Sequence, residues 1–259
     1  MPTIELATHE WPPTTSAPTP RTAVLVHGVT GWWKTWWRVG PALAERGWRV
    51  IAVDQRAHGR SPAGEPCTVD DLARDLEAAI ERHAGTPVDV LIGHSLGAAV
   101  SQRLVWLRSD IARRVVLEDP PSFERRDDDD FQDRLRAEVA AAAERPEDEV
   151  RRELEENPSW LEEDARQDVE GRAMTRPEVL IGSLRLGRGF DVAKLAAELA
   201  VPARYILAAE DRSVMQGDAR RRLQRHLPPG SDVVVLDGGH TLHRDRYDEY
   251  LAAILDFVG

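Results

Sequence analysis

The chain has 259 residues, of which 42% are hydrophobic, and it carries a formal net charge of −11 at pH 7. This length fits one large α/β domain, or a core with an inserted subdomain. The net negative charge argues against nucleic acid as the main partner. A single cysteine, Cys67, excludes an internal disulfide framework.

The apolar runs are far too short to cross a bilayer, so we expect no transmembrane helix and no membrane partner. Residues 1–20 lack the basic start and the apolar core of a signal peptide. Together these features predict a cytoplasmic location.

Short apolar runs alternate with helix-like patterns along residues 1–121. Residues 3–7 have the pattern of a short edge strand, and residues 11–20 that of a turn-rich connector. Buried strands are expected at residues 23–27, 48–53, 88–92 and 114–117. Helices are expected at residues 41–46, 69–83 and 98–107. This alternation predicts a mostly parallel sheet covered by helices on both faces.

Half of the eight tryptophans, at positions 32, 33, 36 and 37, follow the Gly28–Gly31 loop directly. Their spacing places them on one side of the start of a helix. One interpretation is that they anchor this helix to the core. The alternative is that one or two of Trp32, Trp33 and Trp36 line a substrate pocket, because they lie beside the loop.

The alternation of strand and helix stops at residues 122–190. This segment has helical patterns near residues 146–156, 159–172 and 177–186, and it holds 20 acidic residues against 12 arginines. We interpret residues 122–190 as a helical cap inserted into a core formed by residues 1–121 and 191–259. The alternation then resumes, with strands expected at 203–208 and 232–236 and helices at 217–226 and 245–258.

The most informative stretch is Gly93-His-Ser-Leu-Gly97, which follows an apolar strand and precedes a helix-like segment. A serine between two glycines at a strand–helix turn is typical of an exposed nucleophile on a strained backbone. The glycines are required because neighbouring backbone passes too close for a side chain. The context therefore predicts that Ser95 is a nucleophile.

A serine hydroxyl needs a base to take its proton, and the base works best when a carboxylate orients it. In a parallel sheet the carboxyl ends of the strands meet at one edge. His240 follows the last predicted strand, and Asp211 follows the strand before it. The sequence therefore predicts a Ser95–His240–Asp211 triad.

With these features the chain closely resembles the α/β-hydrolase family over nearly its whole length. The motifs that carry the resemblance are His27-Gly28 with its loop, the segment 54–61, the serine turn, Asp211 and Gly239-His240. The resemblance implies an α/β-hydrolase fold with a helical cap. It also implies that Ser95 is the nucleophile, His240 the general base and acid, and Asp211 the orienting carboxylate.

The resemblance further implies an oxyanion hole formed by the backbone N–H groups of Val29 and Leu96. Such a donor contributes on the order of 3 kcal/mol to lowering the barrier. The chemistry needs no metal and no organic cofactor. The expected partner is a small-molecule substrate, and the sequence does not determine the oligomeric state.

The acid and the base have rivals. The strand before Asp211 ends in two alanines where the family often has a glycine, so Glu210 is an alternative in register. Asp119 is a separate alternative, because it lies at the end of strand 114–117, where some family members keep their acid. His243 is a weaker rival to His240. For His27, His58 and His94 we expect structural hydrogen bonds in loops.

The predicted reaction is hydrolysis of a carboxylic ester through an acyl-serine intermediate. The tryptophans favour an apolar or aromatic substrate. Lactone, thioester, amide and carbon–carbon bond hydrolysis and cofactor-free perhydrolysis use the same triad and stay open. Related epoxide hydrolases have an aspartate at the turn, so Ser95 argues against that activity. A hydrolase-fold protein that binds a small molecule without turnover is the alternative of another class.

Overall fold

The computed structural model describes residues 2–15, 20–121, 129–186 and 190–259. Within them it contains a seven-stranded sheet with the strand order β1-β3-β2-β4-β5-β6-β7. Only the β1–β3 pairing is antiparallel, and every other pairing is parallel. The predicted α/β class with a mostly parallel sheet is confirmed.

All strands but the first lie close to their predicted positions. In chain order they are β1 (Thr8–Trp11), β2 (Arg21–Val26), β3 (Trp48–Val53), β4 (Val90–His94), β5 (Val115–Glu118), β6 (Ala203–Leu207) and β7 (Asp232–Val235). The inner strands are rich in valine, isoleucine and leucine and are buried along their length, as expected for strands covered on both faces.

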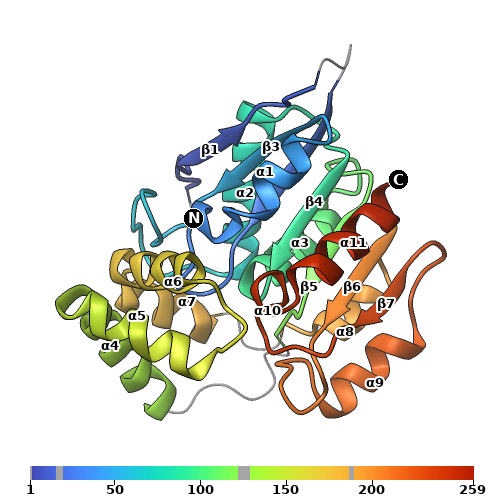
Figure 1. Ribbon diagram of the computed structural model, residues 1–259. Helices are drawn as coiled ribbons and strands as arrows, with labels where there is room; N and C mark the ends of the chain where they lie inside the picture. The colour runs from blue at the N-terminus through green and yellow to red at the C-terminus, as the bar shows by residue number, and fades with distance from the viewer. Residues whose placement is uncertain (1, 16–19, 122–128, 187–189) are drawn as a thin grey trace.

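Helices cover both faces of this sheet. One face carries α2 (Val69–His83), α3 (Leu96–Leu107), α8 (Val192–Ala196) and α9 (Gly217–Arg225). The other face carries the 3₁₀ helix η1 (Trp33–Trp36), α1 (Val39–Ala44) and α11 (Tyr247–Val258), of which α1 and α11 lie in front of the sheet in Figure 1.

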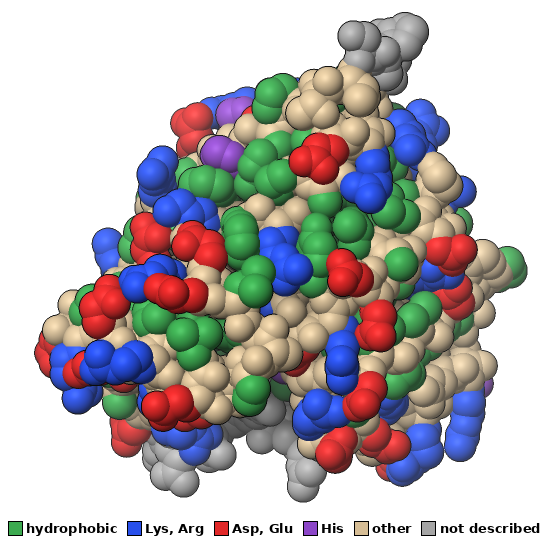
Figure 2. Space-filling model, viewed as in Figure 1, with side chains coloured by type: hydrophobic (Ala, Val, Ile, Leu, Met, Phe, Trp, Pro, Cys, Tyr) green, Lys and Arg blue, Asp and Glu red, His purple; other side chains and the backbone are tan. Residues whose placement is uncertain are grey.

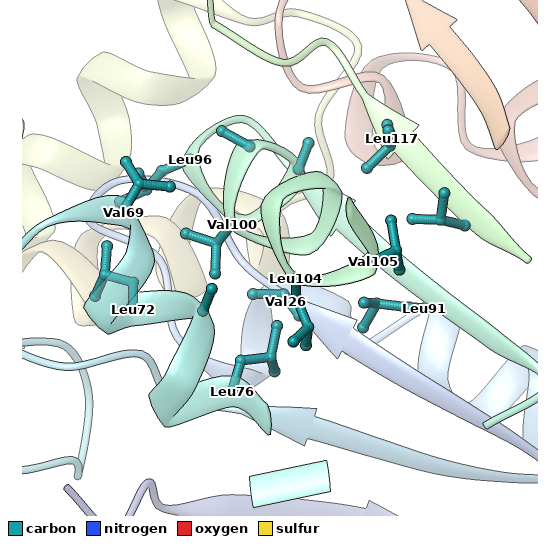
Figure 3. Close-up of a cluster of buried hydrophobic side chains, with 14 of the residues drawn as sticks. Val26, Val69, Leu72, Leu76, Leu91, Leu96, Val100, Leu104, Val105 and Leu117 are labelled. Carbon is teal, nitrogen blue, oxygen red and sulfur yellow. The ribbon is translucent and has the colours of Figure 1, made fainter. Parts of the chain in front are cut away.

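Alternate residues of each strand feed the two apolar clusters. From β4, Leu91 belongs to the cluster under α2 and α3, whereas Val90 and Ile92 belong to the cluster under α1 and α11. Figure 3 shows the first cluster, where Leu72 and Leu76 of α2 meet Val100 and Leu104 of α3 above the sheet.

Four helices that follow β5, which we call the insertion helices, lie before the short helix α8 and strand β6. They are α4 (Asp129–Glu144), α5 (Pro146–Glu156), α6 (Glu162–Met174) and α7 (Pro177–Leu186), gathered at one end of the sheet in Figure 1. The predicted start of the cap, residues 122–128, lies outside the described residues. The division into core and cap therefore stays a prediction.

Charges of both signs alternate over the insertion helices in Figure 2. Arg166 pairs with Glu147 and Glu162, and Arg136 pairs with Asp133 and Glu178. These pairs are largely exposed to solvent, where each contributes little to stability. The acidic surplus of this segment is thus partly balanced by arginines on the same surface.

The structure corrects two predicted elements and adds short helices that were not predicted. The first strand is Thr8–Trp11 instead of residues 3–7, because the N–H groups of Ile4 and Ala7 donate to the side chains of Asp75 and Ser61. The short helix α8 was not predicted. The last helix, predicted at residues 245–258, is α11 and begins at Tyr247, and a separate short helix, α10 (Leu242–Asp245), precedes it.

Within the described part of the chain, no helix is both long and apolar enough to pass through a bilayer.

Candidate active site

Ser95 occupies the sharp turn between β4 and α3. Its backbone has φ +50° and ψ −118°, a conformation that costs a non-glycine residue free energy. Its N–H donates to the carbonyl of Glu118 on the neighbouring strand, at 2.9 Å. The backbone of the neighbouring strand β5 thus helps to hold the turn in its strained conformation.

The two glycines of the turn have no room for a side chain. A Cβ on Gly93 would lie 2.4 Å from the carbonyl oxygen of Gly97, and a Cβ on Gly97 would lie 2.3 Å from that of Val26. Both obstacles are backbone, which cannot move aside cheaply. The predicted reason for the glycines is therefore confirmed.

His240 lies between Ser95 and a carboxylate. Its Nε2 is 2.9 Å from the Ser95 Oγ, and its Nδ1 is 2.7 Å from the Asp119 Oδ2. Because a carboxylate only accepts hydrogen bonds, Nδ1–H donates to Asp119, which leaves the Nε2 lone pair for the serine proton. This is the arrangement that activates a serine nucleophile.

Asp119 is fully buried and held from all sides. Its Oδ1 accepts from the N–H of Ala208, at 3.2 Å, and from the hydroxyl of Ser213, while its Oδ2 accepts from the N–H of Val214, at 3.0 Å. These three donors compensate for the loss of water around a buried carboxylate. Sequence reasoning did not identify Ser213 or Val214 as supports.

The prediction that Asp211 supports His240 is wrong in this structure, because Asp119 makes that contact. Asp211 has a side chain that is 84% exposed and lies 3.9 Å from the Nε of Arg212. The N–H groups of Arg212 and Ser213 both donate to the carbonyl of Ala209, which closes a tight turn. This turn directs Ser213 toward Asp119, whereas Glu210 and Asp211 are solvent-exposed.

Strand order explains this outcome. Strand β5 lies directly beside β4, and Glu118 pairs in register with His94. Asp119 therefore leaves its strand next to Ser95, while the loop after β6 starts one strand further away. Asp119, at the end of the strand beside Ser95, is therefore the acid that contacts His240.

The two backbone N–H groups predicted to form the oxyanion hole belong to segments beside Ser95, and their role stays a prediction. Leu96 is the first residue of α3, so its N–H is one of the four that a helix leaves without an intrahelical partner. Val29 lies in the turn closed by the Gly31 N–H on the Gly28 carbonyl, and a Cβ on Gly28 would be 3.0 Å from the Ser95 Cβ. The Val29 turn thus passes beside the nucleophile.

Three further histidines make structural hydrogen bonds, as predicted. The Nε2 of His27 accepts from the N–H of Gln55, and His58 contacts the carbonyl of Arg56. Burial lowers the pKa of His27 to about 4 and that of His58 to about 3. His94 contacts the carbonyl of His240 at 3.1 Å, and burial holds its pKa well below the ordinary range. These rings are neutral at pH 7.

His243, the weaker rival base, belongs to a separate buried group. Its backbone N–H and its Nδ1 both contact the carboxylate of Glu118, at 2.9–3.0 Å. With His94 these residues bring nitrogen and oxygen atoms within 4.8 Å of one another, a set of donors that zinc accepts. The Nε2 of His94 contacts the His240 carbonyl and the Nδ1 of His243 contacts Glu118, so these contacts give the group a structural role, while the buried Nε2 of His243 has no hydrogen-bond partner among the described residues.

The tryptophans have different surroundings. Trp32 is 1% exposed, and its indole N–H donates to the carbonyl of Gln167 in α6, at 3.1 Å. Trp37 donates to Asp164 of α6, at 2.9 Å. Both tryptophans therefore join the sheet to the insertion helices.

Trp36 is fully buried in the cluster under α1 and α11, with its ring 5.0 Å from that of His243. Trp33 stacks on His9, with ring centroids 3.7 Å apart, and lies near Trp11. The structure thus favours anchoring over the pocket-lining alternative.

An open groove with a volume of about 420 Å³ lies between α4, α5 and α6, among residues such as Ala142, Val150 and Val169. Ser95, Asp119 and His240 do not line it. This groove belongs to the insertion helices alone.

Comparison with known proteins identifies the family of the chain. A sequence model described as "Alpha/beta hydrolase family" matches residues 23–253. The lipase LipV of Mycobacterium tuberculosis is 37% identical over 101 residues, which cover 39% of this chain and 38% of the lipase. Epoxide hydrolase B of the same organism is 34% identical over 96 residues, 36% of this chain and 27% of that protein. The matched segments thus span well under half of each relative.

Among solved structures, E-2-(acetamidomethylene)succinate hydrolase matches with a TM-score of 0.80 at 22% identity. The match covers 98% of this chain and 94% of that one. At this identity the likeness shows a shared fold alone.

Proposed function

This chain belongs to the alpha/beta hydrolase family, and we propose that it is a serine hydrolase that cleaves carboxylic esters. The observation that carries the proposal is the continuous chain of hydrogen bonds from the Ser95 hydroxyl through His240 to the buried Asp119. The likeness to a lipase supports an ester substrate, while the likeness to an epoxide hydrolase shows that relatives break other bonds.

In the proposed reaction, the Ser95 Oγ attacks the ester carbonyl carbon while the Nε2 of His240 takes the hydroxyl proton. Asp119 stabilises the imidazolium that forms. The N–H groups of Val29 and Leu96 stabilise the oxyanion, and each contributes on the order of 3 kcal/mol.

The tetrahedral intermediate collapses, and the alcohol leaves with the proton that His240 returns. Water then attacks the acyl-serine, with His240 taking one of its protons. Ser95 leaves the second intermediate with that proton, which releases the acid and restores the free enzyme.

We propose an apolar group on the substrate. An apolar cluster runs from Leu96, next to the nucleophile, to Leu135 of α4 and Leu180 of α7. Val29, in the turn beside Ser95, packs against this cluster and stays partly exposed, which leaves apolar surface near the reacting serine, and Phe131 of α4 is partly exposed on the same cluster. In this proposal residues 122–190 form a cap that shapes the site and limits the access of water.

A serine-directed fluorophosphonate probe tests the activated nucleophile. Wild-type protein is expected to be labelled at Ser95, whereas Ser95→Ala and His240→Ala variants are not. Absence of labelling in the folded wild type would contradict the proposal and favour a binding protein without turnover. A panel of esters, lactones, thioesters and amides, each with short and long apolar groups, then identifies the bond that is cleaved.

A further inference from the structure

The carboxylate of Asp245 is one of two links between the segment that carries His240 and the insertion helices. The Oδ2 of Asp245 accepts from the backbone N–H of Gly239, at 2.6 Å, directly before His240. The Oδ1 of the same side chain accepts from the indole N–H of Trp160, at 2.7 Å, and from the Ser159 hydroxyl, at 3.3 Å. Asp245 therefore connects the segment between α5 and α6 to the residue that precedes His240.

A second contact lies beside the first. The guanidinium of Arg244, which is 3% exposed, donates to Asp168 of α6, at 2.6 Å, and lies 4.6 Å from the Trp160 ring. Asp168 also pairs with Arg172, which donates to Glu153 of α5 at 2.6 Å. Buried ion pairs with this many partners hold a fixed geometry, because separating them leaves unpaired charges.

Burial alone would raise the pKa of the Asp168 carboxyl, but the charges of Arg244 and Arg172 outweigh burial and lower it. Asp168 is therefore ionised at neutral pH, and its pairing with Arg244 persists there.

The opposite side of the loop is fixed by the sheet. His94 contacts the carbonyl of His240, and His243 is held by Glu118 at the end of β5. The segment from Gly239 to Asp245, which includes α10, thus lies between two sets of anchors, one from the sheet and one from the insertion helices. A shift of the insertion helices would therefore move the Asp245 and Arg244 side of this segment, while the contacts with His94 and Glu118 stay in place.

We propose that Trp160 and Asp245 are positioning residues through which the insertion helices set the placement of His240 relative to Ser95. The inference rests on the proposed function. It implies that the insertion helices act on the reaction step, in addition to any role in shaping the substrate site.

The chain offers a matched pair of variants for the test. Trp160→Phe and Trp37→Phe each remove one indole N–H that donates to an aspartate and keep an aromatic ring in place. Both tryptophans are half-buried, and both hydrogen bonds involve the insertion helices or their connections. Only the partner of Trp160 also holds the backbone next to His240.

We expect Trp160→Phe to lower kcat by about 2- to 30-fold with little change in KM, because catalysis is sensitive to small displacements of the base. Trp37→Phe is expected to leave kcat within about 2-fold, since a single hydrogen bond remote from the base affects mainly stability. The rate of fluorophosphonate labelling should follow kcat, and thermal unfolding of both variants checks that they are folded.

Asp245→Asn is a second, stronger perturbation, because the amide keeps only one acceptor oxygen and no charge, so the Gly239 N–H or the Trp160 N–H loses its acceptor and faces an NH₂ group. It is expected to lower kcat at least as much as Trp160→Phe. Equal kcat and labelling rates in Trp160→Phe, Trp37→Phe and wild type would overturn the inference. If the wild type itself is not labelled, the proposed function fails first, so the two failures are distinguishable.

Discussion

Acidic residues follow two neighbouring strands of the sheet, and their surroundings differ completely. Asp119, after β5, has no exposed surface and accepts hydrogen bonds from His240, Ser213 and two backbone N–H groups. Asp211, after β6, has a side chain that is 84% exposed beside Arg212. The loop after β6 supplies donors to the acid on β5 instead of supplying the acid itself.

The difference shows that an acid at a strand end is not sufficient for a supporting role. A carboxylate can orient a histidine only where burial strengthens the interaction and where donors hold the carboxylate in place. His27, directly after β2, is a third polar residue at a strand end, and it is as deeply buried as Asp119. We therefore expect burial of Asp119 to affect kcat and burial of His27 to affect the pH dependence of stability.

The strongest test of the comparison exchanges the two acids for amides. Asp119→Asn is expected to lower kcat by about 10³- to 10⁴-fold, because an amide at this position favours the wrong histidine tautomer. Asp211→Asn is expected to leave kcat within about 2-fold, since exposed surface changes have small effects. Steady-state hydrolysis of a short-chain aryl ester measures both. A large loss in the Asp211 variant with an active Asp119 variant would reverse the assignment.

The buried His27 predicts a pH dependence of stability. Its side chain takes up a proton near pH 6.5 in the unfolded chain but only near pH 4 in the folded protein. The unfolded state therefore binds more protons in this window, so stability falls as the pH falls from 6.5 to 4. His27 alone contributes about 3 kcal/mol to this loss, at about 1.4 kcal/mol per pKa unit.

Urea unfolding at pH 7 and at pH 4 measures this loss, with His27→Gln as the matched variant. We expect the variant to be less stable than wild type at pH 7 but to lose less stability on acidification. Equal losses in the two proteins would show that His27 does not contribute to the acid sensitivity.

Ser213 tests how the loop after β6 supports Asp119. Ser213→Ala removes the hydroxyl that donates to Asp119 and also the acceptor of the Met215 N–H, at 3.0 Å. We expect the free energy of unfolding to fall by about 2 kcal/mol, as for hydrogen bonds to charged groups. Urea denaturation measures this change. A loss below about 0.5 kcal/mol, the size of an ordinary surface substitution, would contradict the support role.

The smallest effect is expected at the exposed acids. Glu210→Ala and Asp211→Ala should each change the free energy of unfolding by less than about 0.5 kcal/mol, since neither side chain is buried. Thermal unfolding of the two variants checks this, with Ser213→Ala as the contrasting neighbour. A larger loss at Asp211 would indicate a structural role in the turn that starts at Ala209.

Local patterns were sufficient for the elements with strong periodicity. Strand β3 and helices α2, α5 and α7 begin and end at their predicted residues. The short helices α8 and α10 were missed, because a few residues carry too little periodicity. Strand β1 was placed too early, since the N–H groups of Ile4 and Ala7 donate to the distant side chains of Asp75 and Ser61 instead of to a neighbouring strand.

The sequence by itself determined that Ser95 lies on a tight strand–helix turn and that His240 follows the last strand, because glycine spacing and apolar periodicity are local properties. Only the tertiary structure decided which carboxylate supports His240 and where the tryptophans lie. Those outcomes depend on strand order, which places Asp119 beside Ser95. They also depend on the turn after β6, which exposes Asp211 while Ser213 points inward to Asp119.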